Sequence, residues 1–80
     1  MDQIRVVEAR YIADYKIEFH FSDKSTKIID LKNEIYGEVF EPLKKIENFK
    51  KFKLNHFTIE WENGADFAPE FLFNYEKELV

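Results

Sequence analysis

The feature that most constrains the fold is a seven-residue segment in which apolar and polar side chains alternate strictly, Tyr15-Lys16-Ile17-Glu18-Phe19-His20-Phe21. Successive side chains of a β-strand point to opposite faces, so the four apolar side chains would share one face and the three polar ones the other. A sheet with one buried face and one solvent-facing side follows, and such sheets are usually antiparallel.

The flanking sequence extends this strand into a meander. Residues 4–11 are rich in β-branched side chains and predict a first strand. Ala13-Asp14 predicts the turn after it, and residues 22–25 predict a second turn. Residues 26–31 then predict a third strand, so that the first thirty residues form three antiparallel strands.

The middle of the chain changes period. Apolar residues recur at every third position, which favours one helix or two short ones with an apolar stripe toward the sheet. Pro42 suits a first helical turn, where its missing N–H costs nothing. A period of three drifts off an α-helix, so we expect a break near Glu47-Asn48. Residues 53–55 and 58–61 predict two short strands around a turn at His56. The periodic residues are Phe40, Leu43, Ile46, Phe49 and Phe52.

A turn and a helix are predicted for the C-terminal part. Both residues of Asn63-Gly64 tolerate positive φ, which makes the pair a strong turn signal. Pro69 predicts the start of a terminal helix, with Asp66 and Glu70 near that start, where negative charge complements the helix dipole. The helix would carry one apolar stripe, made of Phe71, Leu72, Tyr75 and Leu79.

These elements predict an α+β fold: an antiparallel sheet, made of an N-terminal three-stranded meander plus a short hairpin, packed with a middle helical segment and a short C-terminal helix. A chain of 80 residues and 9.7 kDa suffices for one domain, so we expect residues 1–80 to form a single unit. A membrane span would need an apolar run of roughly 20 residues, and the chain has none. It also has no cysteine and no signal-peptide pattern at its start. We therefore expect a cytoplasmic protein with no membrane contact.

Aromatic side chains and segregated charge are the two unusual features of the composition. Nine Phe, four Tyr and one Trp are hard to hide completely in 80 residues, so most are expected in the core and some at an interface. The net charge of −4 disfavours a dedicated nucleic-acid binder. Basic residues nevertheless cluster at Lys44, Lys45, Lys50, Lys51 and Lys53, and acidic residues crowd the last third at Glu60, Glu62, Asp66, Glu70, Glu76 and Glu78. These runs suit either solvated faces or a dipolar surface that orients a partner.

Four segments resemble a family catalogued as Domain of Unknown Function 2442, found in bacteria. The most specific is Thr58-Ile59-Glu60-Trp61-Glu62-Asn63-Gly64-Ala65-Asp66-Phe67-Ala68-Pro69-Glu70-Phe71-Leu72, which is similar to the family's Trp, Asn-Gly-x-Asp and Pro signature. Gly37-Glu38-Val39-Phe40-Glu41-Pro42-Leu43 resembles a second block, and Val6-Val7-Glu8-Ala9 with Phe21-Ser22-Asp23 resembles the N-terminal strands. One departure is Lys24, where the family often has Gly, which suggests a looser turn.

The resemblance implies a small α+β fold and little about activity. It implies stand-alone proteins that are often encoded beside a second short protein of unknown function, and no catalytic or ligand residue can be transferred.

The candidate binding residues are Trp61, Asn63, Gly64, Asp66 and Pro69. One interpretation is a turn followed by a helix entry, with positive φ at Gly64 and with Asp66 bonded to free N–H groups of the helix. The other is a recognition edge in which Trp61 is an aromatic anchor beside Asn63 and Asp66.

Parts for catalysis or metal binding are scarce. His20 and His56 would need to meet a carboxylate such as Glu18 or Asp66, and nothing in the spacing brings them together, so we expect no metal and no cofactor. The carboxylate pairs Glu60 with Glu62 and Glu76 with Glu78 suit a solvated surface. Gly37 and Gly64 are isolated and form no phosphate loop. No catalytic residue is assigned.

The sequence thus favours a non-enzymatic protein-interaction module, in an antitoxin-like or regulatory pairing with the product of a neighbouring gene; a homo-oligomer is compatible with it. The alternative is a regulatory domain that contacts nucleic acid through the five lysines, as a dimer or within a complex. A small hydrolase that uses His20 or His56 with a carboxylate is the remaining hypothesis.

Overall fold

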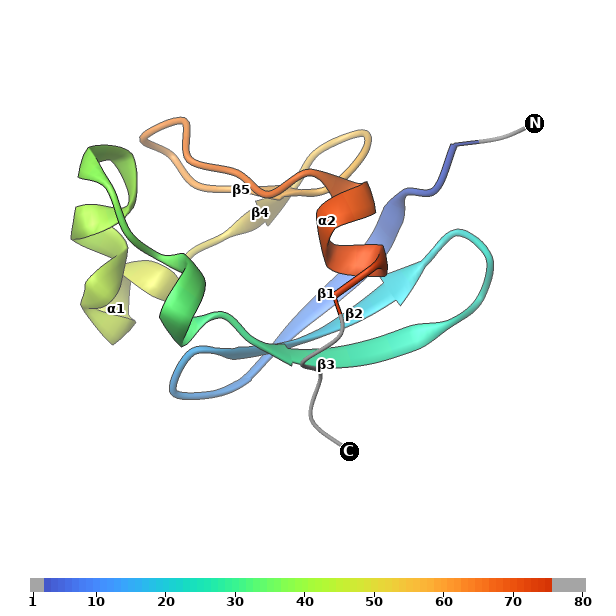
Figure 1. The fold of residues 1–80 in the computed structure, drawn as a ribbon, viewed down its shortest axis with the longest axis horizontal. Helices are drawn as coiled ribbons and strands as arrows, with labels where there is room; N and C mark the ends of the chain where they lie inside the picture. Colours follow the sequence, from blue (N-terminus) through green and yellow to red (C-terminus); the bar gives the residue numbers. More distant parts are fainter. Residues whose placement is uncertain (1–2, 76–80) are drawn as a thin grey trace.

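Two small antiparallel sheets enclose the core of the protein. The computed structural model describes residues 3–75, and its first three strands, β1 (Val6–Ala13), β2 (Lys16–Phe21) and β3 (Thr26–Asp30), form one sheet in the order β1-β2-β3. A hairpin of β4 (Lys53–Leu54) and β5 (Ile59–Glu60) lies with helix α2 (Pro69–Phe73) over one face of this sheet (Figure 1). This arrangement confirms the α+β fold, with a meander, a short hairpin and a few short helices.

The alternation in β2 has the predicted consequence. Ile17, Phe19 and Phe21 are at most 1% exposed, whereas the polar side chains between them are half-buried on the outer face. Ile17 lies opposite Tyr11 in β1 and Ile29 in β3, so the inner positions of all three strands face the same core. The strand boundaries differ from prediction by one or two residues at most, because β1 carries register shifts that a period-two pattern does not reveal.

The two turns of the meander are tight, which corrects one expectation. Lys24 adopts a φ of 74°, the left-handed conformation that a glycine would take without strain. Its amide donates to the carbonyl of Phe21 at 2.9 Å. Asp23 accepts a hydrogen bond from the amide of Ser25 at 2.9 Å, which holds the turn closed. The departure from the family pattern therefore produces a strained turn and not a looser one. In the first turn, Asp14 has a φ of 51°.

The period of three in the middle segment is that of a 3-10 helix. A short 3-10 turn (Lys32–Glu34) follows β3, and a longer 3-10 helix covers Glu38–Lys44. Such a helix has three residues per turn, so residues three apart lie on one side of it. The predicted break near Glu47-Asn48 is wrong: the chain is extended at Lys45, and α1 (Ile46–Phe49) runs through Glu47-Asn48. The position predicted for Pro42 is also wrong, since this residue lies inside the 3-10 helix and not in a first turn.

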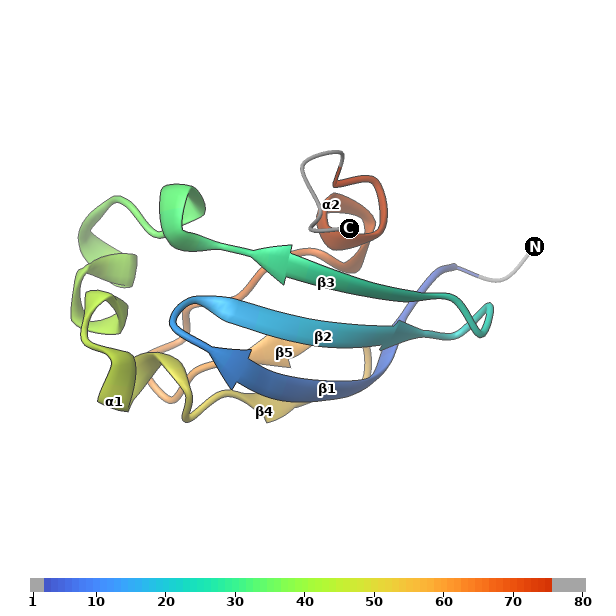
Figure 2. The ribbon, with the colours of Figure 1, turned by 90° about the horizontal axis from the view of Figure 1, so that it is seen from below.

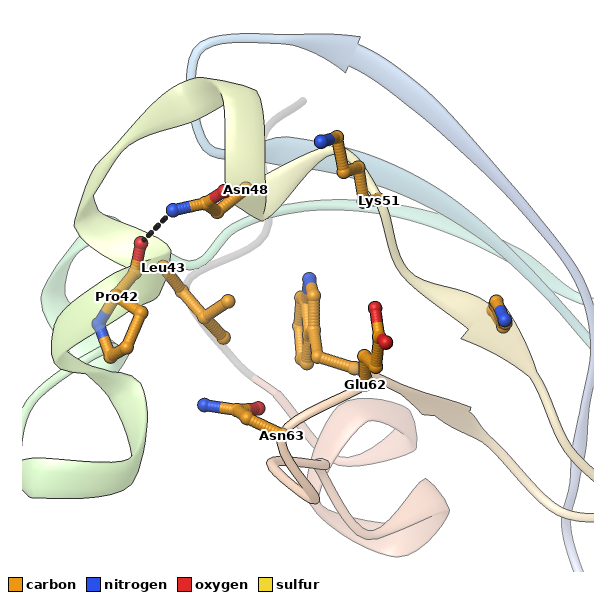
Figure 3. A pocket seen from close by; sticks show the side chains of 8 residues that line it. Pro42, Leu43, Asn48, Lys51, Glu62 and Asn63 are labelled. Atoms are coloured by element: carbon orange, nitrogen blue, oxygen red, sulfur yellow. Dashed lines mark hydrogen bonds between the residues drawn. The ribbon is translucent and has the colours of Figure 1, made fainter.

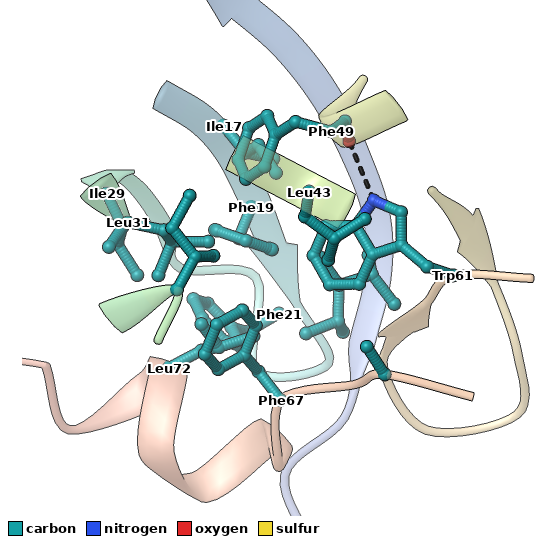
Figure 4. Close-up of a cluster of buried hydrophobic side chains, with 14 residues drawn as sticks. Ile17, Phe19, Phe21, Ile29, Leu31, Leu43, Phe49, Trp61, Phe67 and Leu72 are labelled. Atoms are coloured by element: carbon teal, nitrogen blue, oxygen red, sulfur yellow. Dashed lines mark hydrogen bonds between the residues drawn. The ribbon is translucent and has the colours of Figure 1, made fainter. Parts of the chain in front are cut away.

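Aromatic rings fill the space between the sheet and the hairpin (Figure 4). Phe49 and Trp61 lie with their ring centroids 5.7 Å apart, and the indole Nε1 of Trp61 donates to the buried backbone carbonyl of Phe49 at 2.7 Å. Thr58 is the one buried polar residue in the part of the chain that the structure describes, and its hydroxyl donates to the carbonyl of Phe67 at 2.7 Å. The core is thus packed by aromatic rings and closed by hydrogen bonds to backbone carbonyls.

The terminal helix begins at Pro69, as predicted, and is shorter than its apolar stripe suggested. Leu72 is fully buried and Phe71 is 38% exposed, but the helix ends at Phe73, before Tyr75. The ammonium group of Lys27 on β3 donates to the carbonyls of Phe73 and Tyr75, which satisfies groups that a longer helix would have bonded itself. Leu79 lies outside the described residues. Within those residues, none of the helices has both the length and the apolar character needed to cross a bilayer.

Candidate functional site

A hollow of about 550 Å³ opens between the 3-10 helix, α1 and the end of β5 (Figure 3). We call it the Trp61 hollow. Pro42, Leu43 and Asn48 form one wall, Lys51 lies across from Asn63, and Glu62 closes another side. It brings together residues that the sequence analysis had assigned to two separate candidate sites. Its lining consists of Pro42, Leu43, Asn48, Lys51, Lys53, Trp61, Glu62 and Asn63.

Trp61 lines the hollow from within the core. It is 3% exposed, and its ring also contacts Phe52 and Phe67 at centroid distances of 6.3 and 5.9 Å. An anchor that projects from the surface into a partner would have to be exposed, so Trp61 does not have the predicted anchor geometry. Its ring instead forms part of the inner surface of the hollow.

The Asn63-Gly64 turn is confirmed and does more than reverse the chain. The amide of Gly64, whose φ is 91°, donates to the carbonyl of Trp61 at 2.9 Å. Asn63 donates through Nδ2 to the carbonyl of Val39 at 2.8 Å and accepts from the amide of Ala65 at 3.1 Å. In a 3-10 helix the carbonyl of Val39 would receive the N–H of Pro42, which a proline lacks. The Asn63 side chain supplies that missing donor and fixes the turn against the 3-10 helix.

Two of the candidate binding residues, Asp66 and Pro69, do not line the Trp61 hollow. Asp66 is exposed and pairs with Glu60 in an isolated antiparallel bridge, so it does not cap α2. The residue before α2 is Ala68, which makes no side-chain cap. The reason is that the tight turn lets the chain pair back along β5 before the helix begins. The capping role predicted for Asp66 is therefore wrong, whereas Glu70 does lie in the first helical turn.

The five candidate lysines divide into two groups, although all five are exposed. Lys51 and Lys53 line the hollow. Lys44 pairs with Glu41, with 3.2 Å between Nζ and Oε2, and Lys45 and Lys50 flank α1 on either side. Segment 44–53 contains five lysines and a single acidic residue, Glu47, so this segment is basic, although Glu41 and Glu62 lie beside it.

The polar lining of the hollow is mixed: Lys51, Lys53 and two asparagine amides supply donors, and Glu62 supplies a carboxylate acceptor. Asn48 donates through Nδ2 to the carbonyl of Pro42 at 2.9 Å, just as Asn63 donates to Val39. Each amide group has two N–H bonds and each ammonium has three, with no acceptor on the nitrogen. Together with the apolar surface of Pro42, the lining suits a ligand with carboxylate or carbonyl oxygens beside an apolar group.

The ionisable groups on the open face of the meander form a separate cluster, far from the hollow in sequence. Glu18 accepts hydrogen bonds from His20 at 3.1 Å and from Arg10 at 3.2 Å. These hydrogen bonds, the one from His20 most strongly, hold the pKa of Glu18 below its usual range. Glu8 lies 3.8 Å from His20. No group of three or more potential metal ligands occurs among residues 3–75.

The remaining carboxylate and histidine candidates are dispersed. Glu60 accepts from Nδ2 of Asn55 at 2.8 Å, whereas Glu62 follows the end of β5 and lines the hollow, so the two do not share a strand face. His56 is exposed beside Phe57. Glu76 and Glu78 lie outside the described residues. Asn48 and Leu43 were not singled out from the sequence as site residues, since their spacing indicated only helix and core.

The fold is therefore that of a small α+β domain with an irregular second half. The family to which the chain belongs agrees with this class. Residues 6–78 match the family described as "Protein of unknown function (DUF2442)", and the chain belongs to this family. No curated protein and no solved structure matches the chain. Its function therefore has to be inferred from the site itself.

Proposed function

We propose that the protein is a non-enzymatic interaction module of the bacterial cytoplasm that binds a segment of another protein in the Trp61 hollow. The observation that carries the proposal is the convergence, in one hollow, of Trp61 and Asn63 with Lys51 and Lys53. An antitoxin-like or regulatory pairing with the product of a neighbouring gene is the concrete form that we favour.

The chemistry of the lining specifies the kind of segment. Pro42 is exposed and offers apolar surface at the rim of the hollow, and buried apolar contacts at the centre of an interface supply most binding energy. Lys51, Lys53 and the two asparagine amides offer donors around it. A partner segment with an apolar side chain next to an Asp or Glu would satisfy both, with the carboxylate directed to the lysines.

The test is affinity purification from the host of the tagged protein and of two charge-reversed variants. Lys51→Glu with Lys53→Glu reverses the charge of the hollow. Arg5→Glu with Lys24→Glu makes the same change in net charge at two exposed positions, beside the turn between β2 and β3. Wild type and the Arg5/Lys24 variant should each retain one stoichiometric protein partner. The hollow variant should lose it, with affinity falling at least about tenfold, because juxtaposed like charges cost several kcal/mol.

The absence of any protein partner, or a partner retained equally by both variants, would contradict the proposal. Circular dichroism of the two variants serves as the control, since both replace exposed side chains and should leave the fold intact.

Nucleic acid is the second candidate, favoured by the five exposed lysines within ten residues. Phosphate contacts release counterions, so such binding would weaken steeply as salt is raised. The same eluates, assayed for nucleic acid, and a binding titration at two salt concentrations would detect it. If no binding occurs even at low salt, this second candidate is eliminated.

A further inference from the structure

The Trp61 hollow lies at the open end of the β4–β5 hairpin. Lys53 of β4 lies directly opposite Glu60 of β5. Side chains on one face of a strand recur at every second residue, so Lys51 and Glu62 would form the next pair of opposite charges on that face if the ladder continued. Figure 2 shows that the open end of the hairpin is directed toward α1, where the hollow lies.

The two members of this pair are held apart instead. β5 ends at Glu60, and the amide of Trp61 donates to the carbonyl of Ala65 at 2.8 Å, so the chain enters a turn at Glu62 and does not extend the ladder. Lys51 lies in the turn between α1 and β4. The two side chains line the hollow from different sides (Figure 3). The hollow therefore opens between opposite charges that a longer hairpin would have joined.

The charged residues that line the hollow are Lys51, Lys53 and Glu62, and all three are exposed. Within residues 3–75, none of their side chains forms a hydrogen bond or an ion pair. Glu60, which faces Lys53 across the hairpin, is instead bonded to Nδ2 of Asn55 at 2.8 Å. An occupant of the hollow thus meets a positive side and a negative side, neither of which is neutralised by the described part of the chain.

We propose that Glu62 selects the partner segment, which carries a Lys or Arg toward Glu62 as well as an Asp or Glu toward the lysines, with an apolar side chain between them. This role of Glu62 rests on the proposed function and adds a second, basic requirement to it. Matched charges across an interface fix register and reject wrong partners more than they raise affinity. A purely acidic segment would place a like charge against Glu62, which disfavours it.

The experiment is an NMR titration of the ¹⁵N-labelled protein with three end-blocked peptides of equal length. The dipolar peptide carries Asp, Leu and Lys separated by single glycines, the acidic peptide has Gln in place of the Lys, and the basic peptide has Asn in place of the Asp. The dipolar peptide should shift the amides of residues 48–53 and 61–63. It should bind about two- to fivefold more tightly than the acidic peptide at low salt, which is the range of an exposed ion pair. Raised salt should shrink this difference.

Two variants of Glu62 test the sign of the effect. Glu62→Gln should bind the dipolar and acidic peptides equally, and Glu62→Lys should bind the acidic peptide more tightly than the dipolar one. The matched control Glu70→Gln makes the same change in net charge as Glu62→Gln at an exposed residue outside the hollow, and it should keep the wild-type preference. All three variants replace exposed side chains, so the fold should be retained.

Equal affinity of wild type for the dipolar and acidic peptides, or a preference that survives Glu62→Gln, would overturn the role of Glu62 and leave the proposed function standing. A preference lost equally in Glu70→Gln would also overturn it, because net charge and not the position of Glu62 would then be the cause. If none of the three peptides shifts residues 48–53 and 61–63, the proposed function fails, and the role of Glu62 fails with it.

Discussion

The meander (β1–β3) and the second half of the molecule (residues 31–75) differ in how they bury side chains and satisfy backbone hydrogen bonds. In the meander, backbone ladders satisfy the main chain and every second side chain enters the core. In the second half, side chains of Thr58, Trp61 and Asn63 bond to backbone carbonyls that no ladder satisfies. The meander carries paired charges on its open face and also exposes the aliphatic side chains of Val7 and Ile12, whereas the second half exposes aromatic rings and lysines. This contrast supports the proposal that binding belongs to the second half.

The strongest test of the meander's part is Phe19→Ala. Phe19 is fully buried at the centre of β2. The truncation should lower the free energy of unfolding by about 3–5 kcal/mol, and chemical denaturation measures the loss. The control Phe57→Ala truncates a side chain that is 56% exposed. It should cost less than about 1 kcal/mol. Similar losses for the two variants would mean that the inner face of the sheet is wrongly assigned.

Trp61→Phe tests whether side-chain hydrogen bonds hold the second half. The variant keeps an aromatic ring but removes Nε1, leaving the buried carbonyl of Phe49 without that donor. The expected loss is about 1–3 kcal/mol in the same denaturation assay. A loss within a few tenths of a kcal/mol would show that packing alone, as in the meander, stabilises this half.

A double-mutant cycle sharpens the same point at the surface. Asn63→Ala removes the donor to the carbonyl of Val39. It should cost about 1 kcal/mol in the free energy of unfolding. In the Pro42→Ala background the restored backbone N–H replaces that donor, so the cost of Asn63→Ala should fall to the part that comes from the lost hydrogen bond of the Ala65 amide. Additive effects of the two substitutions would refute the compensation between Pro42 and Asn63.

In the meander, by contrast, a substitution at the tight turn of Lys24 is expected to raise the stability of the protein. The φ of Lys24 is 74°, which a glycine adopts without steric cost. Lys24→Gly should therefore raise the free energy of unfolding by about 0.5–1 kcal/mol, and the rise in melting temperature measures it. Lys16→Gly, within β2, is the matched control and should be destabilising. A destabilised Lys24→Gly protein would show that the turn is not strained.

The smallest expected effect concerns the open face of the meander. Hydrogen bonds from His20 and Arg10 lower the pKa of Glu18, so its contribution to stability is present above the ordinary glutamate pKa and is lost as the pH falls through the lowered value. Unfolding measured from pH 6 down to pH 2 should therefore show a shallower acid loss for Glu18→Gln than for wild type. Identical pH profiles would indicate that the pairing contributes nothing.

How far the sequence predicts each region follows from the same contrast. The strict alternation around Phe19 identified the meander, because apolar side chains at every second position share one face only in a β-strand. The period of three around Pro42 was misread, since the 3-10 helix depends on a hydrogen bond from Asn63, which is distant in sequence. The candidate residues Trp61, Asn63, Lys51 and Lys53 were found individually, but their convergence in one hollow depends on tertiary packing. Composition favoured burial of most aromatic side chains, but it did not say which ones, and the motif around Trp61 left an exposed anchor open as an alternative.

Hydrogen exchange of the complex captured from host cells, compared with the free chain, tests the central claim most directly. The account predicts slower exchange at residues 48–53 and 61–63 around the hollow. The meander turns at residues 13–15 and 22–25 should exchange as in the free chain. Protection confined to those turns and to the open face of the meander would contradict the assignment of binding to the second half.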